Sequence, residues 1–390
     1  MVLLKEENGV ALILALLLLV VLTFIGISSV NTTTYDLLIS GNKRVSEQTF
    51  YVGEAGFNEF MGRFREGATG EIIDTNQSSP DWRLFLAKNT ERAKEIGYDS
   101  ANPNHFFNQS LQTELDFGVE IKHKVDLSNK VVTKGGLPIY IVKSHGFTIE
   151  GGNKVIEVEI IKRPNLDPPA AVYSKAPVNL KGSSTYIQGN DQCPVSSTYN
   201  KPGIITTTST ITESGSPTID GSPPTETNSS KNLNLSEMVD YLKNYANFNY
   251  GYNDNETLTG YSDSWGTPTS DGTEKPLGYT GSMNIVYFNM SGGNTVKLAG
   301  GSHGAGILLV NGNLEINGGF SWYGDIIVTG GLKFTGGGDK NITGGVFAGD
   351  SADFEIDMGG NIGILYCSGV VKKLKDTVPP LKMTRWREIF

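Results

Sequence analysis

An unbroken apolar run covers residues 10–30 and contains no charged residue. A helix of that length rises about 30 Å, because each residue adds about 1.5 Å, and this matches the hydrocarbon core of a bilayer. The run therefore predicts a membrane-spanning helix near the N-terminus.

The apolar run continues into a mixed polar segment that keeps a helical stripe. Phe50, Phe57, Phe60, Met61 and Phe64 recur at spacings that place them on one face of a helix, and the first proline is Pro80. We therefore expect one helix over residues 10–66, about 85 Å long, apolar at first and amphipathic later.

The segment after Gly9 resembles a known family. A short leader ending in glycine, an uninterrupted apolar helix and the motifs GNKR (41–44) and GEAG (53–56) are similar to the N-terminal region of PilX-type minor pilins. The resemblance implies that a prepilin peptidase cuts between Gly9 and Val10 and that Val10 is N-methylated. It also implies a helix that serves first in the inner membrane and then in filament assembly. The residues expected to face the membrane and later the other subunits include Leu14, Leu17, Leu22 and Phe24.

The leader and Leu14 bear on topology and role. No A-x-A-like site for signal peptidase closes the apolar run, and Lys5 favours an N-terminus in the cytoplasm. We expect a single-pass protein of the bacterial inner membrane that later reaches a pilus or the cell surface. Major pilins carry glutamate at the position of Leu14, so this chain departs from them there. A plain signal-anchor helix is the alternative.

Residues 67–168 predict a helix followed by a small antiparallel sheet. Asp81 is a plausible N-cap for a helix over 81–97. Alternating apolar and polar residues then follow in three runs, 119–126, 137–149 and 153–163, as is typical of half-buried strands. We expect this sheet to cover the phenylalanine stripe of the long helix.

A short repeat dominates residues 169–380. An apolar-x-apolar triplet followed closely by glycine recurs, and a second series of apolar runs starts 18–20 residues apart at Ile307, Ile326, Val346 and Ile364. Such a period is typical of a stacked solenoid, so we predict a right-handed parallel β-helix. An antiparallel β-sandwich is the alternative. The middle residues of the triplets alternate in charge, and they are Asn179, Lys297, Glu315, Lys333 and Glu355.

The solenoid is predicted to carry an insertion at residues 191–282. It opens with a low-complexity Ser/Thr-rich run and then contains a helix over 235–248 that begins near Ser236. Its aromatic residues either form an exposed binding surface or cover the open end of the solenoid. These are Tyr250, Tyr252, Tyr261 and Trp265. The tail, residues 381–390, is expected to pack back. The predicted fold class is therefore α+β.

Charge and cysteine content narrow the partners. The net charge of −9 argues against a nucleic-acid backbone as the main partner. Cys193 and Cys367 either pair as a disulfide in an oxidising periplasm or remain two free thiols.

Few residues suggest catalysis or cofactors. The string GGSHG at 300–304 matches a nucleophile-elbow pattern, but an apolar strand follows it where that motif requires a helix. We therefore expect no enzyme and no cofactor. Asp350, Asp353 and Asp357 are weak candidates for calcium, with solvated turn positions as the alternative. A second weak set is Asp254, Glu256, Asp263 and Asp271.

The sequence favours a structural function. We predict a minor pilin that is matured by prepilin peptidase, joins other minor and major pilins, and acts in pilus assembly, initiation or tip adhesion. The solenoid would then be available for a surface or carbohydrate ligand. The alternatives are a membrane-anchored β-helix adhesin that never enters a filament and a polysaccharide-acting β-helix enzyme.

Overall fold

A computed structural model describes residues 7–66, 79–99, 105–108, 116–134, 137–193, 199–207, 210–260, 265–267 and 281–389. The chain divides into two compact units, which we describe separately. The first unit comprises residues 1–123, 140–159 and 385–390, and the second comprises residues 124–139 and 160–384.

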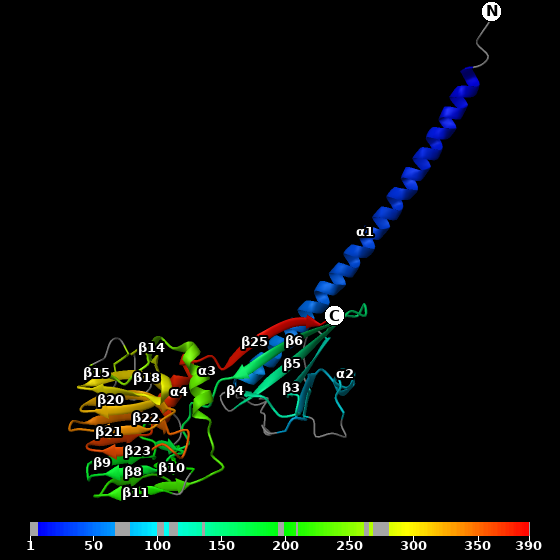
Figure 1. Cartoon of the computed structure of the whole chain (residues 1–390). Helices are drawn as coiled ribbons and strands as arrows, with labels where there is room; N and C mark the ends of the chain where they lie inside the picture. The colour runs from blue at the N-terminus through cyan, green and yellow to red at the C-terminus, as the bar shows by residue number, and fades with distance from the viewer. Residues whose placement is uncertain are drawn as a thin grey trace, which may run out of the picture. The chain divides into compact units, whose positions relative to one another are not determined.

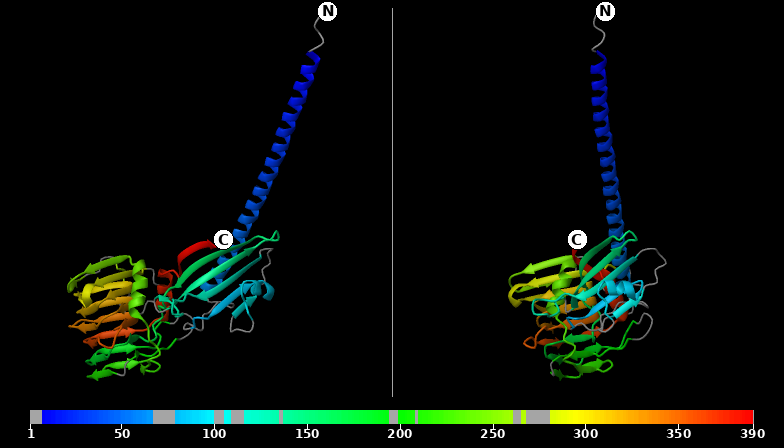
Figure 2. Two further views of the ribbon diagram at one scale, coloured as in Figure 1. Left: turned by 45° about the vertical axis from the view of Figure 1, so that its right-hand side comes forward. Right: turned by 90° about the vertical axis from the view of Figure 1, so that its right-hand side faces the viewer.

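The predicted long helix is confirmed as α1, Glu7–Glu66. It is one unbroken helix in both views of Figure 2. No proline interrupts it. The hydroxyls of threonines 32–34 each donate a hydrogen bond to the backbone carbonyl four residues earlier. By length and composition it is the one helix of the described chain that could cross a membrane, a test that a signal sequence also passes.

An antiparallel sheet follows α1 along the chain. Its strand order is β2-β1-β3-β5-β6-β25, with β4 beside β5. The β1/β2 pair is parallel, whereas β3 runs antiparallel to both β1 and β5. The strand bounds are β1 Arg83–Ala87, β2 His105–Asn108, β3 Asp116–His123, β4 Thr133–Lys134, β5 Leu137–Phe147, β6 Asn153–Lys162 and β25 Leu381–Ile389. The tail therefore does pack back, as a strand beside β6.

The helix predicted over residues 81–97 is largely wrong. The first half is strand β1, because four consecutive apolar residues, 84–87, are buried between neighbouring strands. Only α2, Thr90–Glu95, is helical, and its N-cap is Asn89 rather than Asp81. The Asn89 side chain accepts a hydrogen bond from the backbone of Arg92, which fixes the start of the helix.

The second half of α1 packs on this sheet. Thr49, Val52, Phe57, Phe60 and Met61 are buried. The glycines of the GEAG motif allow close approach, since a Cβ on Gly56 would lie 2.6 Å from Ser144 Oγ. Of the predicted stripe, Phe57, Phe60 and Met61 are therefore buried in this packing, Phe50 is partly buried, and the side chain of Phe64 lies outside the described residues.

The second unit is a parallel β-solenoid, as predicted, and not a sandwich. Its strands form two parallel sheets that stack coil upon coil (Figure 1). The first sheet contains β7 Val172–Ser174, β9 Thr185–Gln188, β10 Ile204–Thr206, β12 Thr218–Asp220, β13 Thr225–Thr227, β14 Phe248–Tyr252, β16 Asn284–Met290, β18 Ser302–Asn311, β20 Phe320–Val328, β22 Lys340–Ala348 and β24 Ile362–Leu365. The second contains β8 Val178–Lys181, β11 Ile211–Ser214, β15 Glu256–Thr259, β17 Thr295–Ala299, β19 Asn313–Asn317, β21 Leu332–Thr335 and β23 Ile356–Gly359.

The order of coils in space differs from their order in the sequence. Coils from residue 284 to 365 stack in sequence, and the last of them lies on the first coil, because β22, β23 and β24 pair with β7, β8 and β9. The strands of 204–227 stack beyond that first coil, and the strands of 248–259 pair with β16 and β17 at the other end. The solenoid is thus circularly permuted relative to a simple stack.

This arrangement corrects the predicted insertion at 191–282. Residues 204–227 and 248–259 are the two terminal coils of the same sheets, not a separate segment. Their sequence is polar because a terminal coil has one stacked side, so Ile204 and Ile205 are buried while most of 210–218 is exposed. The predicted helix at 235–248 is shorter than expected. Helix α3, Leu235–Leu242, is capped by Asn234, continues as the 3-10 turn η1, Lys243–Tyr245, and gives way to strand β14.

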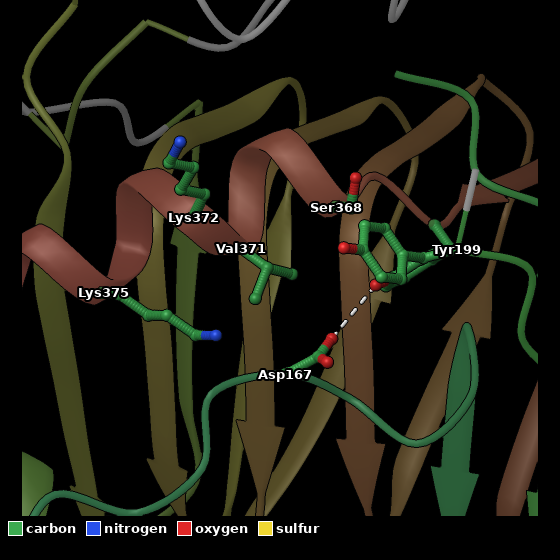
Figure 3. Close-up of a pocket in the computed structure, with 7 residues that line it drawn as sticks. Asp167, Tyr199, Ser368, Val371, Lys372 and Lys375 are labelled. Carbon is green, nitrogen blue, oxygen red and sulfur yellow. Dashed lines mark hydrogen bonds between the residues drawn. The ribbon is translucent and has the colours of Figure 1, made fainter. Parts of the chain in front are cut away.

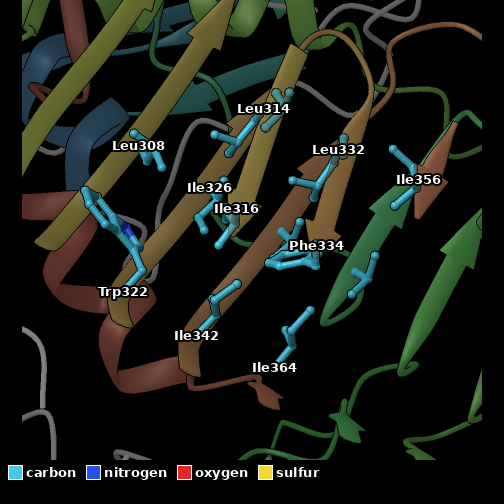
Figure 4. Close-up of a cluster of buried hydrophobic side chains, with 14 of the residues drawn as sticks. Leu308, Leu314, Ile316, Trp322, Ile326, Leu332, Phe334, Ile342, Ile356 and Ile364 are labelled. Atoms are coloured by element: carbon cyan, nitrogen blue, oxygen red, sulfur yellow. The ribbon is translucent and has the colours of Figure 1, made fainter. Parts of the chain in front are cut away.

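Apolar ladders fill the interior of the coils. Leu314, Leu332 and Ile356 stack in one ladder, next to a parallel ladder of Ile316 and Phe334, and all are nearly inaccessible (Figure 4). A glycine ladder, Gly306, Gly324 and Gly344, bends the long strands with φ values of 117°, 140° and 150°. A Cβ on Gly324 would lie 1.9 Å from the carbonyl oxygen of Gly306, so only glycine fits this bend.

A second apolar cluster lies on the outside of the coils. Outward residues such as Ile307, Leu309 and Ile327 are fully buried. Helix α3 lies over β18 and β20, and α4, Ser368–Thr377, lies over β18, β20 and β22. These two helices therefore shield one outer face of the solenoid from water.

Candidate functional site

The first half of α1 is an exposed apolar surface. Every residue from 11 to 44 is exposed, and the predicted assembly residues Leu14, Leu17, Leu22 and Phe24 expose 60%, 60%, 58% and 69% of their area. Gly9 and Val10 lie in the first turn of the helix, and residues 1–6 of the leader lie outside the described residues. An apolar surface of this size requires a lipid or protein environment.

The charge ladder runs along one outer face of the solenoid. Lys297 pairs with Glu315 and Glu315 with Lys333 in the register, and the Lys297 ammonium lies 2.8 Å from the Glu315 carboxylate. The next member is Asp357, not the predicted Glu355, because β23 begins at Ile356. Asn179 follows Asp357, since the first coil lies on the last. The alternation of sign is kept with this shift of two residues.

The weak calcium candidates are not brought together. Asp350 pairs with Lys175 at 2.8 Å and accepts hydrogen bonds from the backbone of Leu235 and Ser236 at the start of α3. Burial by itself would raise the pKa of Asp350. The hydrogen bonds from Lys175 and Ser236 outweigh this effect and lower that pKa below its ordinary value. Asp353 bonds to Ser351, and Asp357 contacts Lys181. Within the described ranges, no three His, Cys, Asp or Glu side chains form a metal-binding group.

The second calcium candidate set and the aromatic tract are only partly described. Asp263, Asp271 and Tyr261 lie outside the described residues. Trp265 is fully buried, and Tyr250 stacks on Phe288 with ring centroids 4.9 Å apart. Within the described part of the tract, the aromatic residues therefore cover the end of the solenoid.

The two cysteines meet. Cys193 follows the first coil, Cys367 follows the last, and they form a disulfide with Cα atoms 5.1 Å apart. One carboxylate oxygen of Asp191 accepts hydrogen bonds from the backbone of both Cys193 and Ser368. The disulfide thus links the first coil in the sequence, which ends near Cys193, to the last coil, which ends near Cys367; these two coils lie next to each other in the stack. We call this junction the seam.

The GGSHG string does not form a nucleophile elbow. Ser302 begins strand β18 and is buried, and its hydroxyl donates to the carbonyl of Ala299. His303 contacts the carbonyl of Gly301 at 3.3 Å. The motif is therefore a coil corner.

A cavity of about 360 Å³ opens between α4 and the segment that leads into the first coil (Figure 3). Asp167, Tyr199, Ser368, Val371, Lys372 and Lys375 line it, together with the hydroxyl end of Tyr366. The Tyr366 hydroxyl donates to Asp167 over 3.0 Å, and Lys201 lies 2.7 Å from the same carboxylate. Sequence reasoning missed this site, because its residues come from three segments without a shared motif.

Buried polar groups lie beside the residues that line this cavity. Within the described chain, one oxygen of Asp191 and the hydroxyl of Ser368 are buried without a hydrogen-bond partner. Burial raises the pKa of the Asp325 carboxyl well above its ordinary value, and the nearby Asp167 carboxylate adds to the effect. Burial, with Asp167 beside it, also raises the pKa of Tyr366. The cavity therefore presents Asp167 as an acceptor that Tyr366 and Lys201 hold in place.

Helix α1 combines an exposed apolar half with a second half that packs on a sheet. The family described as PilX N-terminal matches residues 8–58, so the predicted PilX-type N-terminal region is confirmed for that part of the chain. No curated protein matches the chain.

Among solved structures, one match is the competence-associated pilin ComZ from Thermus thermophilus. The sequence identity is 11%, and the alignment covers 88% of this chain and 97% of that one. The TM-score of 0.25 means that the two chains do not superpose as whole molecules.

Proposed function

We propose that this chain is a minor pilin of a type IV pilus or a related filament. Prepilin peptidase removes residues 1–9, Val10 becomes N-methylated, and α1 passes from the inner membrane into the filament. The N-terminus begins in the cytoplasm, and the solenoid is displayed at the filament tip or surface. Its partners are other minor and major pilins.

One observation carries this proposal: the split of α1 into an exposed half and a sheet-packed half. Residues 11–44 are exposed, a length of about 50 Å at helical rise, whereas burial begins near Val45. The exposed apolar surface of this half is larger than soluble proteins leave in contact with water. It therefore requires either lipid or other protein helices around it. Lipid covers this apolar surface before assembly, and the helices of neighbouring subunits cover it in the filament.

Leu14 favours a role at the start of the filament. By resemblance to pilins, a glutamate at this position pairs with the N-terminal amine of a neighbouring subunit. Leucine cannot accept that pair, so this subunit fits best where no such neighbour is needed. That position suits initiation of assembly or tip adhesion.

The test is recovery of the chain in filaments. Filaments sheared from cells that express the intact chain should contain it at low abundance, and cells that express Gly9→Ala should yield filaments without it. Retention of all of the intact chain in the membrane fraction, with none in the filaments, would instead favour a membrane-anchored adhesin. Quantitative mass spectrometry of both fractions measures the difference.

A further inference from the structure

The cavity beside α4 presents both signs of charge and an aromatic side chain. In Figure 3, Lys372 and Lys375 lie on one side of the cavity, Asp167 lies at its lower edge, and Tyr199, which is 53% exposed, lies beside Ser368 on the side away from the lysines. Its volume of about 360 Å³ is within the range that holds a small ligand. The opening is polar, which favours a polar guest over an apolar one.

The acidic side of the cavity is held rigidly. The Asp167 carboxylate accepts from Tyr366, which is only 1% exposed, and pairs with Lys201, which also donates to the carbonyl of Pro168 at 2.6 Å. A carboxylate has about four acceptor positions, so Asp167 can accept further hydrogen bonds. Preorganised acceptors of this kind suit ligand hydroxyl groups.

The basic side carries cations that lack a carboxylate partner. Within the described chain no ion pair involves Lys372 or Lys375. In Figure 3 the Lys375 side chain extends below Val371 in the direction of Asp167, whereas Lys372 points to the other side. Lys375 is therefore placed to pair with an anionic group on a ligand that also reaches Asp167.

Two further groups complete the site. The ring of Tyr199 offers an apolar face with a hydroxyl at its edge, and Ser368 forms part of the cavity wall. The ligand that best matches this site is therefore a small molecule with several hydroxyl groups, one apolar face and one negative charge.

We propose that this cavity binds an acidic sugar, such as a hexuronic acid residue of a surface polysaccharide. The sugar hydroxyls bond to Asp167, the C–H face of the ring lies on Tyr199, and the sugar carboxylate pairs with Lys375. A neutral sugar has no carboxylate to pair with Lys375, and a simple anion makes no ring contact with Tyr199. The inference adds a ligand class to the proposed display of the solenoid.

The test uses the full-length chain in detergent with three probes: glucuronate, glucose and acetate. Saturation-transfer NMR should detect glucuronate, and glucose and acetate should each bind at least about tenfold more weakly, which corresponds to one lost charge pair or ring contact. Equal binding of acetate would reduce the site to a general anion site, and absence of glucuronate binding at millimolar concentrations would overturn the proposal.

Two variants locate the binding. Tyr199→Ala and Lys375→Ala should each weaken glucuronate at least about tenfold, and Lys375→Arg should retain most of it. Lys373→Ala is the matched control, because Lys373 lies on the same helix but does not line the cavity. Equal loss in the control would contradict the assignment. Each variant is compared by thermal unfolding, and processing at Gly9 is measured separately, so failure of ligand binding leaves the pilin proposal standing.

Discussion

The disulfide between Cys193 and Cys367 joins two residues 174 positions apart, across the seam where the first coil of the solenoid lies on the last. Replacing both by serine should lower the free energy of unfolding by about 2–5 kcal/mol, because the loop it closes is long. Urea denaturation under oxidising conditions measures this change.

The control for the disulfide is reduction. Dithiothreitol should destabilise the natural chain by a similar amount and should leave the double serine variant unchanged. A double variant as stable as the natural chain would show that the paired strands alone hold the seam.

The ion pair of Lys297 and Glu315 provides a second prediction. Glu315→Lys places three lysines in adjacent coils and should destabilise the solenoid by up to about 1 kcal/mol, and adding Lys333→Glu should partly restore it. A double-mutant cycle by denaturant unfolding measures the coupling. Additive effects of the two changes would mean that the ladder contributes no pairwise stability.

The same pair predicts a pH dependence. The hydrogen bond from Lys297 lowers the pKa of Glu315 below its ordinary value of 4.5. A lowered pKa in the folded state gives stability that is present above pH 4.5 and is lost as the pH falls through the folded value. The stability difference between the natural chain and Glu315→Gln should therefore shrink below pH 4.5, and a difference that stays constant down to pH 2 would argue against this assignment.

Each end of the solenoid carries a glutamate at an inward ladder position. Glu213 lies opposite Leu180, and Glu256 lies opposite Val296, whose side chains are in the interior. An inward charge on an edge strand opposes stacking of another chain. Changing both to valine should therefore promote end-to-end association, visible as dimers or larger species by light scattering. Persistence of the monomer at high concentration would show that other features protect the ends.

Gly56 tests the packing of α1 on its sheet. A Cβ there would lie 2.6 Å from Ser144 Oγ and 2.8 Å from the Phe117 ring, so Gly56→Ala should cost about 1–3 kcal/mol. Gly62→Ala is the matched control, since nothing lies within 4 Å of its Cβ position, and it should be neutral or stabilising by up to about 1 kcal/mol. Thermal unfolding compares the two. Equal effects at both positions would reject the close approach.

Much of the fold follows from local patterns in the sequence. The long helix, the alternating strands and the glycine-punctuated coils each have a regular spacing of apolar residues, which can be recognised in the sequence. The match of Lys297, Glu315 and Lys333 in register was predictable for the same reason, because neighbouring coils have nearly constant length.

The errors arose where long-range pairing decides the structure. Residues 204–227 are polar, yet they fold as a terminal coil because the first coil provides a template. The ladder shifted from Glu355 to Asp357 because the turn before β23 is longer than the others. The cavity depends on Asp167, Tyr199 and Lys375, which come together only through the permuted order of coils and the placement of α4.

The most direct test of the central claim is the mass of the mature chain in cells with and without prepilin peptidase. We predict a chain that begins with N-methylated Val10 when the peptidase is present, and a chain that retains residues 1–9 when it is absent or when Gly9 is replaced by alanine. A chain that keeps residues 1–9 in the presence of the active peptidase would contradict the account.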